Sequence, residues 1–373
     1  MINIKNYTFL VWITFLLHTY LSFANDGAYY ASGNHLVPIT NENIAVTKEI
    51  LKLTRYNEEY LSVDVYYEFY NHGEEKEVLV GFEAPSPSGD VDGIPVKGSH
   101  PYISKFSVLM NGKSLSYKTA IVNDSIYYKN GNIQAKVESE VIGKDFNTND
   151  PSFYYVYHFN ARFKKGSNVI KHKYMFNLSG SVMERYSFDY ILTAANRWSN
   201  KQIDDFTLII DMGKEQGFTI GESFYNKYDH WVITGKGIMD SGEKNRYKTF
   251  YIEDGFITFY KKNFAPKGEL YLSASRNIQY CQNEKFDAKK CLEIPFDITY
   301  QEKLLSATDF ESYKIVRNLP FARRGYIFKT VYIQEYYENQ KWYIPNPDYQ
   351  PNYEMLLQAE KDWLVNLKNT MTK

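Results

Sequence analysis

The sequence is poor in cysteine, has no excess of either charge and, beyond its first 24 residues, contains no long apolar run. Its 43 Lys and Arg residues nearly balance 44 Asp and Glu residues, so the formal net charge is −1. A near-neutral chain lacks the basic surface that binds nucleic acid or an anionic membrane. No segment after residue 24 is apolar enough to span a bilayer. We therefore expect no nucleic-acid partner and no integral membrane segment in the mature chain.

Only two cysteines are present, Cys281 and Cys291. In an exported chain they would meet an oxidising compartment, so we expect one disulfide that closes a short loop. The loop-entropy model assigns about 2–3 kcal/mol to such a closure. The pair has no histidine nearby and is more widely spaced than most redox pairs, which argues against a metal site or a redox motif.

Motifs of the common enzyme classes are also missing. The chain has no phosphate-binding loop, dinucleotide fingerprint, His-Glu-x-x-His helix or Gly-x-Ser-x-Gly elbow. His158 and His172 flank a turn at Gly166; they could share a metal only if the turn places them opposite each other, and no third ligand is evident. Asp90 and Asp92 supply too few ligands for a calcium loop. We predict no catalytic residue, no metal and no cofactor.

The one long apolar run lies at the start of the chain. It is centred on Phe9–Leu17, and Ser22 and Ala24 occupy the two positions that a signal peptidase reads. We expect residues 1–24 to be a signal peptide that is cleaved between Ala24 and Asn25, which makes the mature protein secreted or periplasmic. An uncleaved anchor is the alternative, because the run is nearly long enough to cross a bilayer.

From residue 25 to about 300, apolar and polar residues alternate with a period of two, which is typical of β-strands with one buried face. We expect three hairpins: residues 61–69 with 78–84, residues 106–115 around Asn111-Gly112, and residues 153–163 turned back by Gly166 into 169–178. Further strands are expected at Arg185–Leu192, Phe206–Asp211, His230–Thr234, Tyr247–Ile252, Phe256–Tyr260 and Leu270–Ala274.

So many short strands without a long helix predict a mainly β protein of one or two antiparallel β-sandwich units. We prefer two units, at residues 25–180 and 181–300, with the boundary between Phe176 and Ser187. Aromatic residues form 17% of the chain, and Tyr alone contributes 35. The β-propensity of tyrosine accounts for them; exposed rings that stack on sugars or peptides are the alternative.

Short motifs in this β region are similar to an uncharacterised exported family, one of the numbered domains of unknown function. They are Asn25–Ala28, the strand pair from Val63 to Pro85, Tyr190–Thr193, Trp198 and Phe206–Leu208. Where that family has a Gly-rich step before the tryptophan, this chain has Ala194–Arg197. The resemblance covers roughly residues 25–280 and implies an immunoglobulin-like β domain with no known chemistry.

After Lys303 the apolar spacing becomes helical. Thr308 or Asp309 can cap a first helix, which we expect Pro320 to interrupt and Gly325 to end. A second helix is expected at Thr330–Gln340, and a third carries apolar residues between 356 and 367. The pattern predicts a small all-α domain at residues 304–373.

Arg317–Phe328, followed by Trp342–Pro345, resembles the YARHG domain, a small module of bacterial proteins. The resemblance spans residues 304–368 and implies a location outside the cytoplasm. In the motif of this chain, Phe321 replaces the family's tyrosine and Arg324 replaces its histidine. The activity of the family is unknown, so the resemblance implies no chemistry.

The motif supplies the candidate binding residues of this chain. An arginine fork beside aromatic rings can hold a carboxylate and stack on a sugar, which are two features of a peptidoglycan fragment. The alternative is that Arg317 and Arg323 pair with Asp309, Glu311 or Glu335 and lock the helices together. The candidates are Arg317, Arg323, Arg324, Tyr326, Trp342 and Tyr343.

Taken together, these features predict an exported, non-enzymatic binding protein of the cell envelope, whose partner is wall polymer such as peptidoglycan or another surface protein. Two alternatives remain open. One is an envelope glycan hydrolase, which would need paired carboxylates facing one cleft. The other is a structural or assembly factor, which would need an exposed sheet edge for strand pairing.

Overall fold

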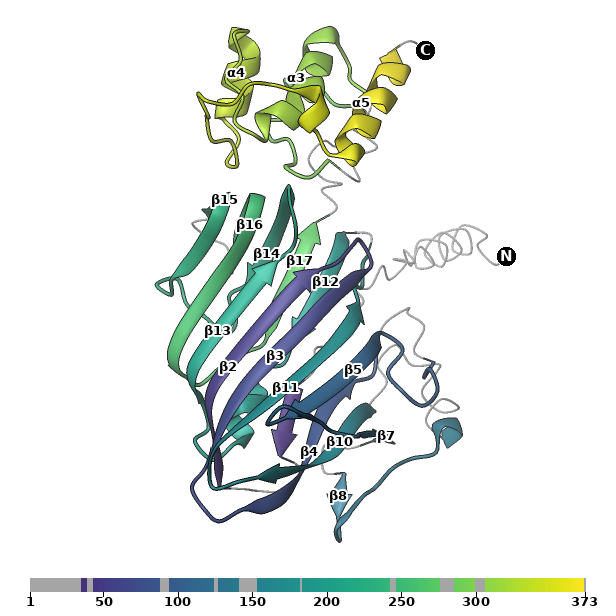
Figure 1. Ribbon diagram of the computed structural model, residues 1–373. Helices are drawn as coiled ribbons and strands as arrows, with labels where there is room; N and C mark the ends of the chain where they lie inside the picture. Colours follow the sequence, from purple (N-terminus) through teal and green to yellow (C-terminus); the bar gives the residue numbers. More distant parts are fainter. Residues whose placement is uncertain are drawn as a thin grey trace, which may run out of the picture.

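The computed structural model describes residues 35–38, 43–87, 94–123, 127–140, 153–181, 183–241, 246–275, 285–298 and 306–371. The signal segment, Asp90, Asp92 and Cys281 lie outside these ranges, so what we expect of them stays a prediction. The chain is mainly β, with a few helices at its C-terminal end, as predicted (Figure 1). No helix of the described ranges is long and apolar enough to cross a membrane.

The strands form two main sheets and one short two-stranded pair. The small sheet has the order β1-β4-β10-β7, and the large sheet has eleven strands in the order β12-β17-β14-β16-β13-β2-β3-β11-β5-β6, with β15 paired to β16. The small sheet and the pair comprise β1 (His35–Pro38), β4 (Lys76–Pro85), β7 (Lys118–Val122), β10 (Tyr154–Phe163), β8 (Tyr128–Lys129) and β9 (Asn132–Ile133). The large sheet comprises β2 (Ile44–Arg55), β3 (Tyr60–Asn71), β5 (Ile103–Met110), β6 (Lys113–Ser114), β11 (Gly166–Asn177), β12 (Glu184–Tyr190), β13 (Ile203–Asp211), β14 (Gln216–Gly221), β15 (Trp231–Asp240), β16 (Tyr247–Phe264) and β17 (Leu270–Ser275).

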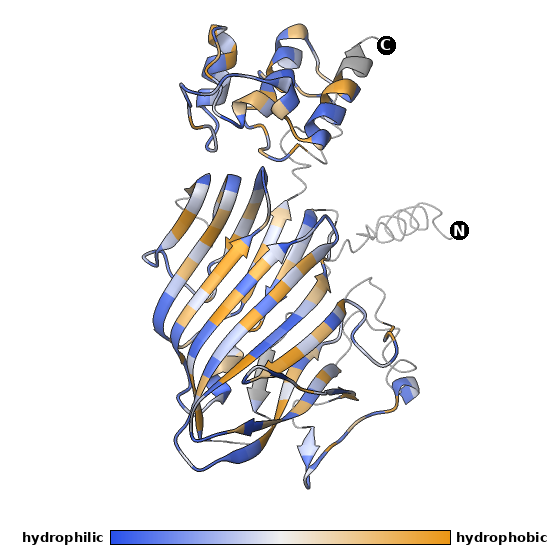
Figure 2. Cartoon of the chain, viewed as in Figure 1, coloured by the Kyte–Doolittle hydropathy of each residue, from blue (hydrophilic) through white to orange (hydrophobic). Residues whose placement is uncertain are grey.

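The small sheet packs on the large one through aromatic side chains. Phe82 of β4 contacts Phe106 of β5 with ring centroids 4.9 Å apart, and His172 of β11 at 5.2 Å. Hydropathy alternates along β13, β2 and β3, whose apolar residues appear as orange bands between blue ones in Figure 2. The predicted period of two therefore reflects one buried face on most strands, and the arrangement is sandwich-like.

Two of the three predicted hairpins are wrong. β3 pairs with β2 and β11, whereas β4 pairs with β1 and β10 in the other sheet. β10 and β11 are likewise divided between the sheets. The period of two identifies the buried face of a strand but not the strand with which it pairs. β3 and β4, and likewise β10 and β11, face each other across the core. The third hairpin is confirmed: Leu109 pairs with Ser114, and Asn111 and Gly112 have φ angles of 50° and 81°.

A pair of glycines bends the long strand β16, which the sequence had divided into two strands. Gly235 of β15 faces Gly255 of β16, with φ angles of 105° and 120°. A Cβ on Gly255 would lie 1.9 Å from the carbonyl oxygen of Thr234, so only glycine fits there. On the side opposite β15, residues before the bend pair with β14 and residues after it pair with β13.

Distant strands of the large sheet lie face to face. Tyr190 of β12 lies across the core from β3, and its hydroxyl is 3.0 Å from that of Tyr67. β13 pairs with β2 in parallel, so the strands on either side of the predicted boundary near residue 180 belong to one sheet and share one hydrophobic core. A short 3-10 helix, η1 (Thr193–Arg197), follows β12.

His172 gives the β core a measurable dependence on pH. Its ring stacks on Tyr67 and Tyr174 at 5.8 and 6.1 Å, and neither ring nitrogen has a hydrogen-bond partner within the described ranges. Burial lowers the pKa of His172 to about 3. Below about pH 6.5 the unfolded chain, whose histidine has an ordinary pKa, therefore binds more protons than the folded chain does. The free energy of unfolding consequently decreases as the pH falls through that range.

We expect His172→Phe to stabilise the protein at pH 5 by about 2 kcal/mol more than it does at pH 8, because the difference in pKa no longer acts at pH 8. Urea unfolding at the two pH values measures this. His72 is exposed at the end of β3, and His72→Phe is the matched control, which should show no such difference. Equal effects of His172→Phe at both pH values would contradict the prediction.

The C-terminal helices are α3 (Phe310–Ala322), α4 (Val331–Glu338) and α5 (Gln358–Met371), with a short η3 (Tyr353–Met355) before the last. The side chain of Asp309 caps α3 by accepting a hydrogen bond from the Ser312 amide at 2.7 Å. Pro320 does not interrupt the helix, contrary to expectation. It lies in the last turn, so the hydrogen bond that proline cannot donate is one of the last of the helix.

The helices share a core with the chain that precedes them. Trp342, Trp363 and Tyr337 are buried in one cluster with Phe286 and Phe296. Tyr251 and Ile238 of the large sheet pack against the same cluster. The core of the helical domain therefore includes residues before 304, and it is continuous with the outer face of β16. Cys291 also lies in this core, and its predicted bond to Cys281 stays a prediction.

Candidate functional site

A cleft of about 950 Å³ is lined by residues of the large sheet and of the chain in and just before the helical domain. Figure 1 shows the helical domain beside one end of the large sheet. One wall is the outer face of β14, β16 and β17. The other is formed by the segment from Leu292 to Asp297 and by Gln340–Trp342. A smaller cavity of about 350 Å³ adjoins it and shares Tyr251, Phe296 and Trp342. Because both the sheet and the helical domain line the cleft, its shape depends on how the two are docked.

The floor of the cleft follows the register of three neighbouring strands. Gly221 of β14 pairs with Tyr247 of β16. On its other side it lies against Tyr271 of β17, whose Cβ is 3.8 Å from the position that a Cβ on the glycine would take. In the neighbouring row, Thr219 pairs with Thr249 and with Ser273. The floor is thus a glycine between two tyrosines beside a row of hydroxyl groups.

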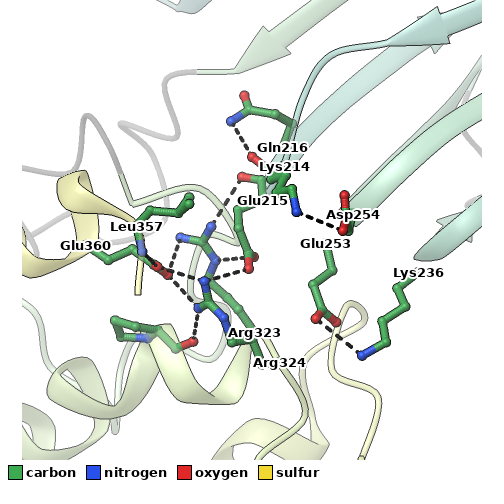
Figure 3. A network of polar contacts seen from close by, with 11 residues as sticks. Lys214, Glu215, Gln216, Lys236, Glu253, Asp254, Arg323, Arg324, Leu357 and Glu360 are labelled. Carbon is green, nitrogen blue, oxygen red and sulfur yellow. Dashed lines mark hydrogen bonds and ion pairs between the residues drawn. The ribbon is translucent and has the colours of Figure 1, made fainter. Parts of the chain in front are cut away.

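A buried ion-pair network holds the helical domain to the sheet (Figure 3). Arg323 Nε donates to Glu215 Oε2 at 3.0 Å, and Arg324 Nη2 lies 3.1 Å from Glu215 Oε1. Arg324 also donates two hydrogen bonds of 2.8 Å to the carboxylate of Glu360 on α5. Glu215 belongs to the turn between β13 and β14, so the network joins the β body to two parts of the helical domain.

The four charges of this network are almost completely withdrawn from water. The side chains of Arg323, Glu215 and Glu360 are 3%, 4% and 1% exposed, and that of Arg324 is 10% exposed. Burial raises the pKa of Glu215, an effect that the two guanidinium groups oppose. Two positive and two negative charges sum to zero, which is the condition under which buried charges are tolerated.

The six predicted binding residues do not form one exposed platform. Arg323 and Arg324 pair with Glu215 and Glu360 and not with Asp309, Glu311 or Glu335, and Arg317 is exposed on α3. Trp342 is buried and donates from Nε1 to the carbonyl of Ile294 at 2.9 Å. The hydroxyl of the buried Tyr343 donates to the carbonyl of Tyr326 at 2.8 Å. Of the six, Trp342 borders both cavities, and the two paired arginines border the smaller one.

The motif glycine has a structural role. Gly325 has a φ angle of 79°, as expected for the end of a helix, and its carbonyl accepts a hydrogen bond from the Asn346 amide at 2.8 Å. A Cβ on Gly325 would lie 2.1 Å from the carbonyl oxygen of Ile344, so the glycine lets the chain after Trp342 cross the end of α3. The glycine in the first half of the motif therefore positions the second half, which begins at Trp342.

Sequence reasoning missed the floor of the cleft. Its signal was present in β14, where Gly217, Thr219 and Gly221 alternate with the buried Phe218 and Ile220. Two glycines on one face of a strand mark a place where a side chain, backbone or ligand approaches closely. At Gly217 the neighbours are Tyr251 and Phe296, at 3.6 and 3.8 Å from a Cβ position.

Comparison with known families identifies the helical part of the chain. Residues 297–372 match the model of the YARHG domain. The C-terminal unit is a YARHG domain. The match begins at residue 297, within the segment that packs into the core of the helices, and YARHG domains are associated with exported proteins. The resemblance inferred from Arg317–Pro345 is therefore confirmed, while the resemblance of residues 25–280 to an uncharacterised exported family stays a prediction.

Comparison with curated proteins found no match. Among solved structures, the chain is similar to a candidate nutrient binding protein from Legionella pneumophila, with 17% identity, coverage of 92% of this chain and 100% of that chain, and a TM-score of 0.49. An M1 zinc metallopeptidase from Deinococcus radiodurans shows 13% identity over 62% of this chain and 42% of its own, with a TM-score of 0.26. Baculovirus P35 shows 14% identity over 64% and 98%, with a TM-score of 0.26. At these TM-scores the likenesses carry no functional argument.

Proposed function

We propose that this protein is an exported, non-enzymatic binding protein of the cell envelope, and that its ligand lies in the cleft between the large sheet and the YARHG domain. The cleft carries the proposal, because it is of the size of ligand-binding pockets and combines aromatic rings with polar groups. The YARHG domain and the signal-like residues 1–24 support export, with cleavage between Ala24 and Asn25. The proposed partner is wall polymer, with a surface protein as the alternative.

The acidic groups of the cleft favour binding over hydrolysis. Two of the three acidic residues that line the cleft are paired with cations: Asp240 lies 3.1 Å from the ammonium group of Lys341, and Asp297 forms an ion pair with Arg185. The third, Glu293, is exposed and would need one of these two as its second carboxyl group. A glycan hydrolase needs one carboxyl group that can hold a proton and a second that faces it across the substrate. Carboxylates neutralised by neighbouring cations are poor proton donors. We therefore do not assign hydrolysis to this cleft.

The edge strand β15 gives little support to the assembly-factor alternative. Its pairing with β16 contains an irregularity between Lys236 and Gly237. Bulges and lysines on an edge strand oppose the addition of a further strand. The edge next to the cleft is therefore protected against strand pairing.

Retention on purified cell-wall sacculi tests the proposal. Wild-type mature protein should be retained, and Thr249→Arg, which places a long side chain on the cleft floor, should weaken retention about tenfold, or about 1.4 kcal/mol. Thr258→Arg adds the same charge to the outer face of the same strand outside the cleft and should retain wild-type affinity. If wild-type protein is retained neither on sacculi nor on surface proteins extracted from the envelope, the proposed function is wrong. Equal retention of the two arginine variants would place the ligand elsewhere.

A further inference from the structure

The cleft floor contains a slot of defined width. Neighbouring strands of a sheet lie about 4.8 Å apart, so the backbones of Tyr247 and Tyr271, on the strands that flank β14, are about 10 Å apart with Gly221 between them. Glycine contributes no side chain, so the row consists of two phenol rings with bare backbone between them. Tyr247 is 41% exposed. The hydroxyl of Tyr271 donates to the carboxylate of Glu184, which fixes the orientation of that ring.

A polar row runs parallel to the slot, two residues further along the strands. It consists of Ser273, Thr219 and Thr249 and ends at Asp240, which pairs with Thr249. The hydroxyl groups of Thr219 and Ser273 lie 3.1 Å apart. Two residues of a strand span about 7 Å, so a ligand in the slot lies within reach of this row. Hydroxyl groups both donate and accept hydrogen bonds, so the row suits a ligand with groups of the same kind.

The two glycines of β14 differ in what covers them. At Gly217, Phe296 beside the YARHG domain and Tyr251 approach within 3.8 Å of a Cβ position. At Gly221 the nearest atoms belong to Tyr271, at 3.8 to 4.0 Å. Both glycines line the cleft, but the segment that leads into the YARHG domain narrows it at Gly217, whereas the contacts of Gly221 come from the neighbouring strand β17.

We infer that the cleft binds a carbohydrate chain, with a sugar ring held between Tyr247 and Tyr271 over Gly221 and its hydroxyl groups bonded to the row of Thr219, Thr249 and Ser273. This inference rests on the proposed function and names the class of ligand. A sugar ring has an apolar face that packs on an aromatic ring and a rim of hydroxyl groups that exchange hydrogen bonds. The tyrosine and hydroxyl rows carry no formal charge, and the acid beside them, Asp240, is paired with Lys341. The two rows themselves therefore offer no cation, whereas Arg246 and Lys290 line the cleft outside the rows and can pair with an acidic substituent of the carbohydrate.

Gly221→Val tests the slot directly. The backbone at Gly221 does not require a positive φ angle, and a Cβ there would make only ordinary contacts, so valine is compatible with the strand. Its branched side chain would fill the space between the two tyrosines. Tyr247→Ala removes one wall of the slot, and Tyr228→Ala is its matched control, since Tyr228 is 83% exposed and does not line the cleft.

The binding of full-length mature protein is measured to three probes: intact peptidoglycan sacculi, glycan strands freed from stem peptides by an amidase, and the released peptides. We expect binding to sacculi and to glycan strands, no competition by peptides, and an affinity about tenfold lower for Gly221→Val and Tyr247→Ala with unchanged thermal unfolding. Tyr228→Ala should bind like wild type. Binding that follows the peptides, or wild-type affinity in both slot variants, would overturn the carbohydrate inference and leave the cleft proposal intact. If wild-type protein binds no sacculi, the wall-polymer proposal and the inference both fail.

Discussion

Arg323→Ala is expected to lower the free energy of unfolding by about 3–5 kcal/mol, the loss typical of removing one partner from a buried ion pair. In the wild-type protein, Arg323 and Arg324 neutralise Glu215 and Glu360 inside the interface between the sheet and the YARHG domain. Without Arg323, two buried carboxylates share one guanidinium group. The unbalanced negative charge must be hydrated, which requires the interface to open, or neutralised by taking up a proton, which costs free energy at neutral pH.

Arg162→Ala is the matched control, because Arg162 also forms an ion pair, at 2.6 Å from Glu75, but both side chains are largely exposed at 73% and 42%. An exposed pair contributes about 0–1 kcal/mol, so this variant should unfold almost like wild type. Urea unfolding followed by tryptophan fluorescence compares the two. If Arg323→Ala left unfolding unchanged but abolished retention on sacculi, Arg323 would be a binding residue and the structural role assigned here would be wrong.

The ion-pair network illustrates which features of the structure could be predicted from the sequence and which could not. The motif indicated that Arg323 and Arg324 matter, and aromatic spacing indicated a small helical core around Trp342 and Trp363, which the structure contains. The partners could not be inferred from spacing, because Glu215 is 108 residues from Arg323 and lies in a turn of the β body. Local patterns predict which residues share a face of one element; they contain no information on which distant element that face meets.

The same distinction explains the strands. Burial alternates along β3, β11 and most of β10 as predicted, whereas β4 is buried on both faces from Val80 to Ala84, and the local Asn111-Gly112 turn gives the predicted hairpin. Pairing between the sheets was misjudged because two strands that face each other across a core have the same alternation as two that pair side by side. Tyr247–Ile252 and Phe256–Tyr260 were predicted as two strands, whereas Gly255, with its positive φ angle, lies within one continuous strand that pairs with β14 before the glycine and with β13 after it.

The second large effect is expected from Trp342→Ala. Trp342 is 5% exposed, lies 5.6 Å from Phe296 and 5.9 Å from Tyr337 between ring centroids, and donates a hydrogen bond to the carbonyl of Ile294. Removing a buried indole costs about 3–5 kcal/mol, which a domain as small as this one cannot absorb. We expect the YARHG domain to unfold while the β body, whose core is a separate cluster, stays folded. Circular dichroism should show loss of the helical signal and a remaining β transition.

A matched pair of conservative variants separates packing from hydrogen bonding at this position. Trp363 is 6% exposed in the same cluster, but within the described ranges its Nε1 has no hydrogen-bond partner. Trp363→Phe therefore loses volume alone, whereas Trp342→Phe also leaves the buried carbonyl of Ile294 without its donor. Trp342→Phe should be the more destabilising of the two by about 1–3 kcal/mol, the penalty for an unsatisfied buried polar group. Equal losses in thermal unfolding would show that the Ile294 carbonyl finds another donor, and a β body that melts together with the helices in Trp342→Ala would show that the two cores unfold as one unit.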